Sequence, residues 1–327
     1  MRHEPQSIVV GMATFRRPEL LGSLLPQVLA QIEHLCEEWS HPLQTGVVVV
    51  DNDPAGSARE TVLAIGDDRI RYAIETEPGI SSARNRVLRE AGDADLLVLL
   101  DDDETPHESW LLHLVNAHRE HGADAVSGPV RAVFDGPEDA WVAASGTYLE
   151  PLRTGTRTGT VLRRAATNNL LLDLRTVRAM GLRFDPRFGL SGGEDSLFTG
   201  QLTGAGGRLV WCAEALVDDI VPAARNTRGF QLHRRFAQSA TTVRVETMLA
   251  EGAGARLRLG VRWLVIGAGQ LLKGAAQTLA GRLTRSLPRT ALGERRVASG
   301  LGVLAGSLGL SAKPYARARR PRGPRQG

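Results

Sequence analysis

Four short apolar runs divide the first hundred residues of this 327-residue chain, and they constrain its fold more than any other feature. The runs cover residues 8–10, 46–50, 70–74 and 96–100. Apart from Arg71 in the third run, they are apolar on successive residues, which is typical of strands buried on both faces, as in a parallel sheet. Between and after them, helical spacing predicts helices over 18–32, 81–89 and 108–121, the second capped by Ser81 and Ser82. This alternation predicts a doubly wound α/β sheet, mostly parallel and flanked by helices, with ligands at the carboxyl ends of the strands.

The charge of the chain is divided between its two ends. Residues 1–228 contain 22 Lys and Arg against 33 Asp and Glu, a net charge of −11. Residues 229–327 contain 18 against 3, a net charge of +15, so the overall +4 averages two unlike regions. We predict an α/β domain over residues 1–240, a basic amphipathic helical region over 241–312 and a disordered cationic tail over 313–327.

Nothing in the sequence predicts export or a membrane-spanning helix. The first apolar run is too short for the core of a signal peptide, and no uncharged apolar stretch reaches the roughly 18 residues of a spanning helix. The two cysteines, Cys36 and Cys212, cannot make a disulfide framework and lack metal-ligand spacing. We therefore expect the protein to stay in the cytoplasm.

An acidic run, Asp101-Asp102-Asp103-Glu104, directly follows the buried run LLVLL. Four acids at a strand end repel one another, so solvent, arginines or a divalent cation must compensate. Asp101 and Asp103 have the spacing that points two carboxylates the same way, and Mg²⁺ or Mn²⁺ prefers one or two carboxylates together with phosphate oxygens. The alternative is a solvated acidic loop that caps the next helix.

Two further segments lie where strands and helices meet. Asp51 ends the run VVVVD, where a carboxylate can accept hydrogen bonds from a base or a ribose; the alternative is a turn residue. The segment GISSARN, which begins at Gly79, is a glycine loop that leads into a helix. Free amides there suit a phosphate, and Arg84 adds a fixed positive charge, although a plain helix start explains the pattern equally well.

Glu194 and Asp195 follow Gly192 and Gly193 and precede a predicted helix. The glycines allow a tight turn that exposes a side chain to a large substrate. A carboxylate held there can take the proton from an attacking hydroxyl. The alternative is ordinary capping of the helix by one of these acids.

Taken in order, these segments resemble the family 2 glycosyltransferases of the GT-A fold, over roughly residues 6–240. SIVVGMATFRRPELL is similar to the family's opening strand and VVVVDN to its second nucleotide-contacting strand end. EPGISSARNRVL is similar to its glycine-loop helix, LLVLLDDDE to its metal-binding D-x-D and GGEDSLF to its catalytic Glu-Asp. The opening and the GGED form most resemble the branch that builds bacterial exopolysaccharides of the succinoglycan type.

The resemblance implies a donor site made from strand ends. Thr14, Phe15 and Asp51 would lie about the nucleotide base and ribose, and Arg84 near the base or diphosphate. Asp101 would serve the diphosphate and, with its neighbour two residues on, the metal ion.

The resemblance also implies a reaction. Asp103 would complete the site for Mg²⁺ or Mn²⁺, Asp195 would be the general base beside Glu194, and the family inverts configuration at the anomeric carbon. The expected donor is a nucleotide-diphosphate sugar, and the expected acceptor is a hydroxyl of a glycan or a lipid-linked glycan.

Two departures from the family's pattern qualify this prediction. Phe15-Arg16 stands where the family has Tyr-Asn, so a hydroxyl contact to the base is lost while a stacking face remains. The segment that begins at Gln231, QLHRR, lacks the Trp of the Gln-x-x-Arg-Trp motif of processive synthases. We therefore expect one sugar to be added per encounter.

Other functions remain open from sequence alone. A nucleotidyltransferase also places acids and a metal beside a nucleotide, but it would carry a glycine-rich loop with Arg and Lys after the first strand. A non-enzymatic protein that binds nucleic acid or a membrane through its basic end is a second alternative. A nucleic-acid-binding segment would interleave cations with aromatic residues, whereas the tail contains one aromatic residue, Tyr315. We therefore predict no nucleic-acid partner.

The basic end favours a helix that lies in the membrane interface. Residues 256–285 mix apolar residues with evenly distributed cations, which suit anionic headgroups. Residues 297–312 are uncharged and glycine-rich, and predict either an in-plane hairpin or a packed helix. The alternative for the whole region is an ordinary helical subdomain on the catalytic core. We expect a peripheral protein on the inner face of the cell membrane.

Overall fold

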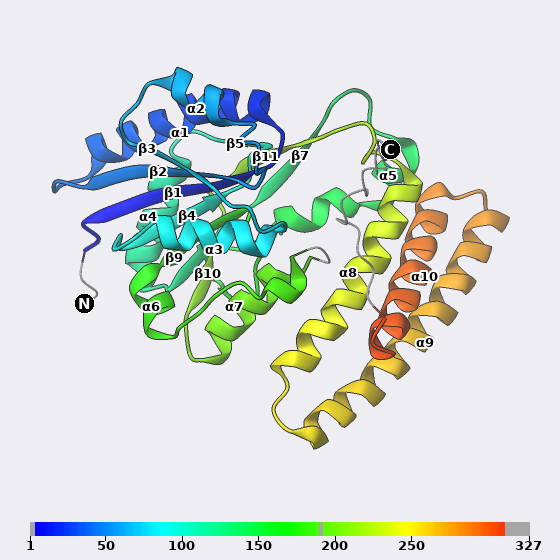
Figure 1. Ribbon diagram of the computed structural model, residues 1–327. Helices are drawn as coiled ribbons and strands as arrows, with labels where there is room; N and C mark the ends of the chain where they lie inside the picture. Colours follow the sequence, from blue (N-terminus) through cyan, green and yellow to red (C-terminus); the bar gives the residue numbers. More distant parts are fainter. Residues whose placement is uncertain (1–3, 190–191, 311–327) are drawn as a thin grey trace, which may run out of the picture.

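A mixed eight-stranded sheet with the order β3-β2-β1-β4-β9-β6-β10-β8 forms the centre of the computed structural model, which describes residues 4–189 and 192–310 (Figure 1). The strands are β1 (Ser7–Thr14), β2 (Gln44–Asp51), β3 (Ile70–Ile74), β4 (Leu96–Leu100), β6 (Ala125–Ser127), β8 (Val161–Leu162), β9 (Asn169–Asp173) and β10 (Leu209–Trp211). The first four pair in parallel, and β9 runs antiparallel between β4 and β6. The four predicted strands and the fold class are confirmed.

Helices cover both faces of this sheet. They are α1 (Pro18–Glu38), α2 (Arg59–Ile65), α3 (Ile80–Glu90), α4 (Trp110–His121), α6 (Leu174–Ala179) and α7 (Glu194–Gly204). The predicted helix over 108–121 begins two residues later, and α2 was not predicted, because it buries only Val62 within its seven residues.

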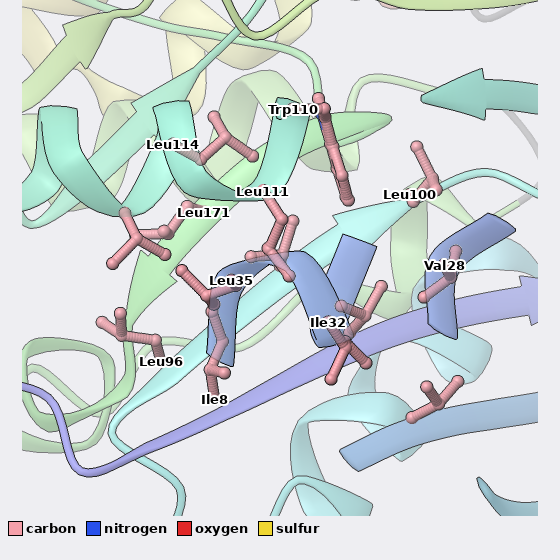
Figure 2. Close-up of a cluster of buried hydrophobic side chains, with 14 of the residues drawn as sticks. Ile8, Val28, Ile32, Leu35, Leu96, Leu100, Trp110, Leu111, Leu114 and Leu171 are labelled. Atoms are coloured by element: carbon pink, nitrogen blue, oxygen red, sulfur yellow. The ribbon is translucent and has the colours of Figure 1, made fainter. Parts of the chain in front are cut away.

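The core lies on the two faces because successive strand residues point in opposite directions. Val47 and Val49 pack with α1 and α4, whereas Val48 and Val50 pack with α3 on the other face. Figure 2 shows part of the first cluster, where side chains of α1 and α4 meet those of β1 and β4. Uninterrupted β-branched residues in β2 are therefore explained by burial on both sides.

A smaller sheet extends one side of the domain. It has the order β5 (Glu104–Pro106), β11 (Val217–Val221), β7 (Val130–Phe134), and β11 pairs antiparallel with β5. Residues 122–160, predicted as short strands and a loop, also form α5 (Ala140–Ser145) and a 3₁₀ helix (Thr147–Leu152); a second 3₁₀ helix covers Pro186–Phe188. This sheet brings residues near 219 back to the end of β4.

Three C-terminal helices form a layer beside the α/β domain, which we call the helical layer: α8 (Arg228–Leu249), α9 (Ala253–Leu283) and α10 (Leu287–Ser307). α10 lies between the other two, with α8 toward the α/β domain and α9 outermost (Figure 1). Residues 297–307 are thus part of a packed helix, one of the two predicted forms. α8 continues through residue 240, where the sequence predicts a domain boundary.

The helical layer is joined to the α/β domain by ion pairs and hydrogen bonds from α10. Glu294 accepts from Trp141 Nε1 of α5 at 2.9 Å, and within the helical layer it also pairs with Arg228 of α8 at 2.7 Å. Arg295 is buried and donates to the carbonyl oxygen of Ser145. In the described ranges, no helix is both long and apolar enough to cross a membrane. The predicted tail, 313–327, lies outside the described residues.

Candidate active site

The carboxyl ends of β1, β2 and β4 meet at one edge of the large sheet. Thr14 is paired with Asp51 across β1 and β2, and Asp101 follows the last residue of β4. Thr14 donates from its hydroxyl to Asp102 Oδ2 at 2.7 Å, which ties β1 to the acidic run. Sheet topology therefore gathers residues from three segments, as expected for an open α/β sheet.

The acids of the run 101–103 form a turn after β4 and differ in burial. Asp102 is buried, and its two oxygens accept from Thr14 and from Arg17, the latter at 2.8 Å. The side chain of Asp101 is 36% exposed and that of Asp103 is 15% exposed. Asp102 is thus held by protein groups, whereas Asp101 and Asp103 remain partly exposed at the edge of the sheet.

Arginines compensate for the repulsion among these acids. Arg17 donates to Asp102 and also to Asp103 Oδ2 at 2.9 Å, and Arg225 lies 3.7 Å from the same oxygen. Burial alone would lower the pKa of Arg17, but Asp102 and Asp103 outweigh this and raise it. Neither arginine was predicted as a site residue, although arginines were named among the groups that could compensate.

Arg84 joins the two acidic motifs. From α3 it donates to Asp101 Oδ1 at 3.2 Å and to Glu194 Oε1 at 2.5 Å, and the residue is only 7% exposed. Burial opposes its charge, but Asp101, Glu194 and Asp195 raise its pKa, so the guanidinium stays charged. Arg84 therefore binds both Asp101 and Glu194, although Glu194 lies 110 positions further along the chain than Arg84.

Glu194 and Asp195 occupy different environments at the start of α7. Glu194 is 5% exposed, and its Oε2 finds no hydrogen-bond partner within the described part of the chain. Burial raises the pKa of Glu194, Arg84 opposes the rise, and Asp195 adds to it. Asp195 is half-buried, and its Oδ1 accepts from Ser196 N at 2.5 Å. The N-cap residue of α7 is Gly193, so the capping alternative describes neither Asp195 nor Glu194, which binds Arg84.

The glycine before these acids is required by the packing of α8. Gly193 has φ +96°, and a Cβ there would lie 2.1 Å from Thr241 Cγ2. Only glycine combines this backbone conformation with so close an approach. The turn that presents Glu194 and Asp195 therefore rests directly on the helical layer.

Asp51 is fully buried and its carboxylate is occupied by protein groups. Oδ1 accepts from Asp53 N at 2.9 Å, and Oδ2 accepts from Ala58 N at 2.8 Å and Tyr72 OH at 3.0 Å. Asp51 thus shapes the loop after β2, as the turn alternative describes. Its contact with a nucleoside stays a prediction.

Phe15 lies at the same edge, partly exposed, with the Arg16 guanidinium 4.9 Å from the centre of its ring. Arg16 also pairs with Asp53 at 2.8 Å, which connects the turn after β1 with the loop after β2. One aromatic face is therefore already covered by a cation. Stacking of Phe15 on a base stays a prediction.

The first two amides of the glycine loop before α3 are already bound by the protein. Gly79 N donates to Asn52 Oδ1 at 2.9 Å, and Ile80 N donates to Gly189 O at 3.3 Å. The predicted serine cap is also wrong, because Gly79 precedes the helix and Ser81 Oγ donates to Asp185 O at 2.9 Å. The loop instead packs against the segment that leads to Glu194, which brings Arg84 to its partners.

Three further residues of this edge, besides the two arginines, were not predicted as site residues. Glu104 is buried, accepts from Asp101 N at 3.0 Å and from Asn168 Nδ2 at 2.6 Å, and burial raises its pKa well above the usual range. Asp219 is paired with Glu104 in the small sheet, and burial, reinforced by Asp103, raises its pKa to about 6. Glu104 belongs to the acidic run and was detectable; Asn168 and Asp219 have no local signal.

The donor set suits a hard cation that is shared with a ligand. Asp101 and Asp103 are the partly exposed carboxylates, and oxygen ligands are those that Mg²⁺ and Mn²⁺ prefer. Across residues 4–189 and 192–310, no three His, Cys, Asp or Glu side chains form a cluster that could hold a metal by themselves. The residues therefore fit a cation bound through one or two carboxylates and phosphate oxygens.

The sheet order, the helices on both faces and the acids at the strand ends define the chain as a glycosyltransferase of the GT-A type. The model of the family described as glycosyl transferase family 2 matches residues 9–182, more than half of the chain, and the chain belongs to this family. Succinoglycan biosynthesis protein ExoM of Rhizobium meliloti (strain 1021) is 33% identical to it over 255 residues, which cover 77% of this chain and 79% of ExoM. The predicted resemblance to the exopolysaccharide branch is confirmed.

Solved structures show the same fold at low identity. TarS 1-349 of S. aureus in complex with UDP-GlcNAc matches with a TM-score of 0.51 and 12% identity, over 88% of this chain and 90% of TarS 1-349. GalNAc-T7 with UDP, GalNAc and Mn²⁺ matches with a TM-score of 0.52 and 12% identity, over 74% of this chain. The match spans about half, 51%, of GalNAc-T7.

Proposed function

We propose that this glycosyltransferase moves one sugar from a nucleotide-diphosphate sugar to an acceptor hydroxyl with inversion at the anomeric carbon. The observation that carries the proposal is the bridge from Arg84 to Asp101 and Glu194, which sets a carboxylate pair beside a partly exposed acidic edge. The names of the similar structures, which mention UDP and UDP-GlcNAc, support a donor of this class. Family membership favours sugar transfer over the nucleotidyltransferase alternative.

Asp195 is the general base in this mechanism. Its carboxylate takes the proton of the acceptor hydroxyl while the hydroxyl oxygen bonds to C1 of the sugar. The bond from C1 to the phosphate oxygen breaks on the opposite face, and the electron pair leaves with the nucleotide diphosphate. Attack from the opposite face inverts C1.

The other residues hold the charges of this reaction in place. Arg84 stays charged and fixes Glu194 and Asp101 on its guanidinium. Asp101 and Asp103 would hold a divalent cation together with the diphosphate of the donor. Such a cation, when bound, balances the charge that develops on the departing diphosphate. Asp102, Arg17 and Thr14 keep the acidic edge in shape.

The acceptor in this proposal is a glycan or a lipid-linked glycan. The enzyme acts at the inner face of the cell membrane. The name of ExoM, a succinoglycan biosynthesis protein, supports a role in polysaccharide biosynthesis. The basic composition of the C-terminal region supports attachment to an anionic surface.

A panel of UDP-, GDP- and dTDP-sugars with and without Mn²⁺ tests the donor and the metal together by thermal shift. We expect one nucleotide class to raise the melting temperature, and to do so only with the cation. The absence of a shift with every donor would contradict the proposal. The coupling constant of the anomeric proton in the product tests inversion, and retained configuration would exclude Asp195 as base for a single displacement.

A further inference from the structure

The outermost helix of the molecule, α9, exposes several large apolar side chains, whereas its fully buried residues are glycines. Six apolar residues of α9 recur at intervals of four or seven positions, so they share one face, and each is 56–77% exposed: Leu257, Val261, Val265, Leu272, Leu279 and Leu283. We call this face the α9 stripe. It extends over 26 residue steps, about 39 Å of helix.

Close packing on α10 explains why these side chains lie outside. The buried residues of α9 are Gly267, Gly274 and Gly281, and a Cβ on Gly274 would lie 2.7 Å from Val297 N. Leucine cannot occupy such positions without separating the helices. No described part of the chain covers the α9 stripe, so these side chains contribute little to the fold and are free to meet another apolar surface.

The charges around the stripe identify the kind of surface. No Asp or Glu lies between Glu251 and Glu294, whereas α9 carries five exposed cations: Arg256, Arg258, Arg262, Lys273 and Arg282. A second copy of the chain would bring the same positive charge against itself. An anionic bilayer supplies both an apolar layer and complementary headgroups.

We infer that the α9 stripe is the lipid-binding surface of this protein and lies in the plane of an anionic membrane. Close contacts at glycines connect the helix that carries the α9 stripe, through α10 and α8, to the active site. A Cβ on Gly302 of α10 would lie 2.2 Å from Phe236 O of α8, and α8 supports Gly193 through Thr241. The stripe thus holds the turn with Asp195 at a set height above the bilayer. This placement rests on the proposed function, whose lipid-linked acceptor is presented from the same surface.

Flotation of the full-length protein with vesicles tests the inference. The probes are vesicles of phosphatidylcholine alone and with phosphatidylglycerol. The stripe variant is Val265→Gln/Leu272→Gln/Leu279→Gln. Its matched control removes three equally exposed apolar residues of the α/β domain: Leu63→Gln/Leu149→Gln/Val161→Gln. We expect the stripe variant to bind anionic vesicles at least about tenfold more weakly than wild type, and the control to bind within about twofold of it.

A charge variant and a measurement without lipid complete the test. Arg258→Gln/Arg262→Gln/Lys273→Gln should abolish the preference for phosphatidylglycerol. Equal flotation of the stripe variant and the control would overturn the inference. So would a wild type that dimerises without vesicles, does not float, and becomes monomeric in the stripe variant. Circular dichroism melting should show all variants folded.

The donor-induced thermal shift separates this inference from the proposed function. Normal flotation with no donor shift in wild type would reject the donor proposal and leave the stripe assignment standing. A normal donor shift with equal flotation of the stripe variant and the control would do the reverse.

Discussion

Two long helices of this protein use their apolar residues in opposite ways. α1 has 21 residues and buries seven leucine, valine and isoleucine side chains against the sheet. α9 has 31 residues, and its buried residues are three glycines, while the six apolar residues of the α9 stripe are exposed. The sequence of α1 is explained by the stability of the fold. Nothing in the described residues covers the α9 stripe, and its exposed apolar side chains with their neighbouring cations are the reason we assign it to a membrane.

The electrostatics of the two regions differ in the same sense. In the α/β domain, carboxylates gather at a strand end and are held by arginines 17, 84 and 225. In the helical layer, the cations of α9 have no acids on their own helix and remain exposed. We infer that the α/β domain performs chemistry and that the helical layer determines where the chemistry takes place.

The largest expected effect separates chemistry from location. Asp195→Asn removes the base while preserving size, so transfer to soluble and to vesicle-borne acceptors should fall by at least about 10³-fold, roughly 4 kcal/mol. Donor-induced thermal shifts should persist. The stripe variant should lose transfer only to vesicle-borne acceptors. Near-normal turnover by Asp195→Asn would remove the assignment of the base.

A second prediction compares leucines of the two helices directly. Leu25→Ala in α1 opens a cavity beneath the sheet and should cost about 2–5 kcal/mol of unfolding free energy. Leu272→Ala in α9, at 74% exposure, should change it by less than about 0.5 kcal/mol. Urea denaturation measures both. A similar loss for the two variants would mean that the stripe is part of the folded core.

A third prediction tests the close approach of α9 to α10. Gly274→Ala places a methyl group against Val297 N and Gly293 O and should destabilise the protein by about 1–3 kcal/mol. Gly269→Ala on the same helix meets no atom within 4 Å and should stabilise it by up to about 1 kcal/mol. Thermal unfolding of the two variants measures both changes in stability. Stabilisation by both changes would show that the helices are further apart.

The smallest expected effect concerns pH and belongs to the α/β domain. Burial raises the pKa of Asp219 to about 6, above the roughly 3.9 of an unfolded aspartate. Its contribution to stability is therefore present in full below about pH 4 and lost as pH rises through 6. Asp219→Asn should flatten this dependence by on the order of 1–2 kcal/mol in the metal-free protein. Asp93→Asn, an exposed control, should not.

Much of the fold could be read from the sequence because burial leaves a periodic pattern. The runs at 70–74 and 96–100 are strands with the predicted bounds; every residue of the second is buried, and in the first only Arg71 is exposed. α2 left too weak a pattern because only Val62 is buried. From sequence, the glycine loop before α3 could be either a phosphate site or a plain helix start. The groups that accept from its first two amides, Asn52 and Gly189, are remote in sequence and so left no local signal.

The sequence by itself determined the order of the acidic motifs, the parallel strands that carry them and the division of charge, because each is local along the chain. Only the tertiary structure decided which charges meet. It placed Arg84 between Asp101 and Glu194 and brought Asp219 beside Glu104. It also left the α9 stripe exposed, because the glycines of α9 pack closely on α10. Such contacts depend on tertiary packing, and the spacing of apolar residues along the chain does not show which face of a helix will meet a neighbour.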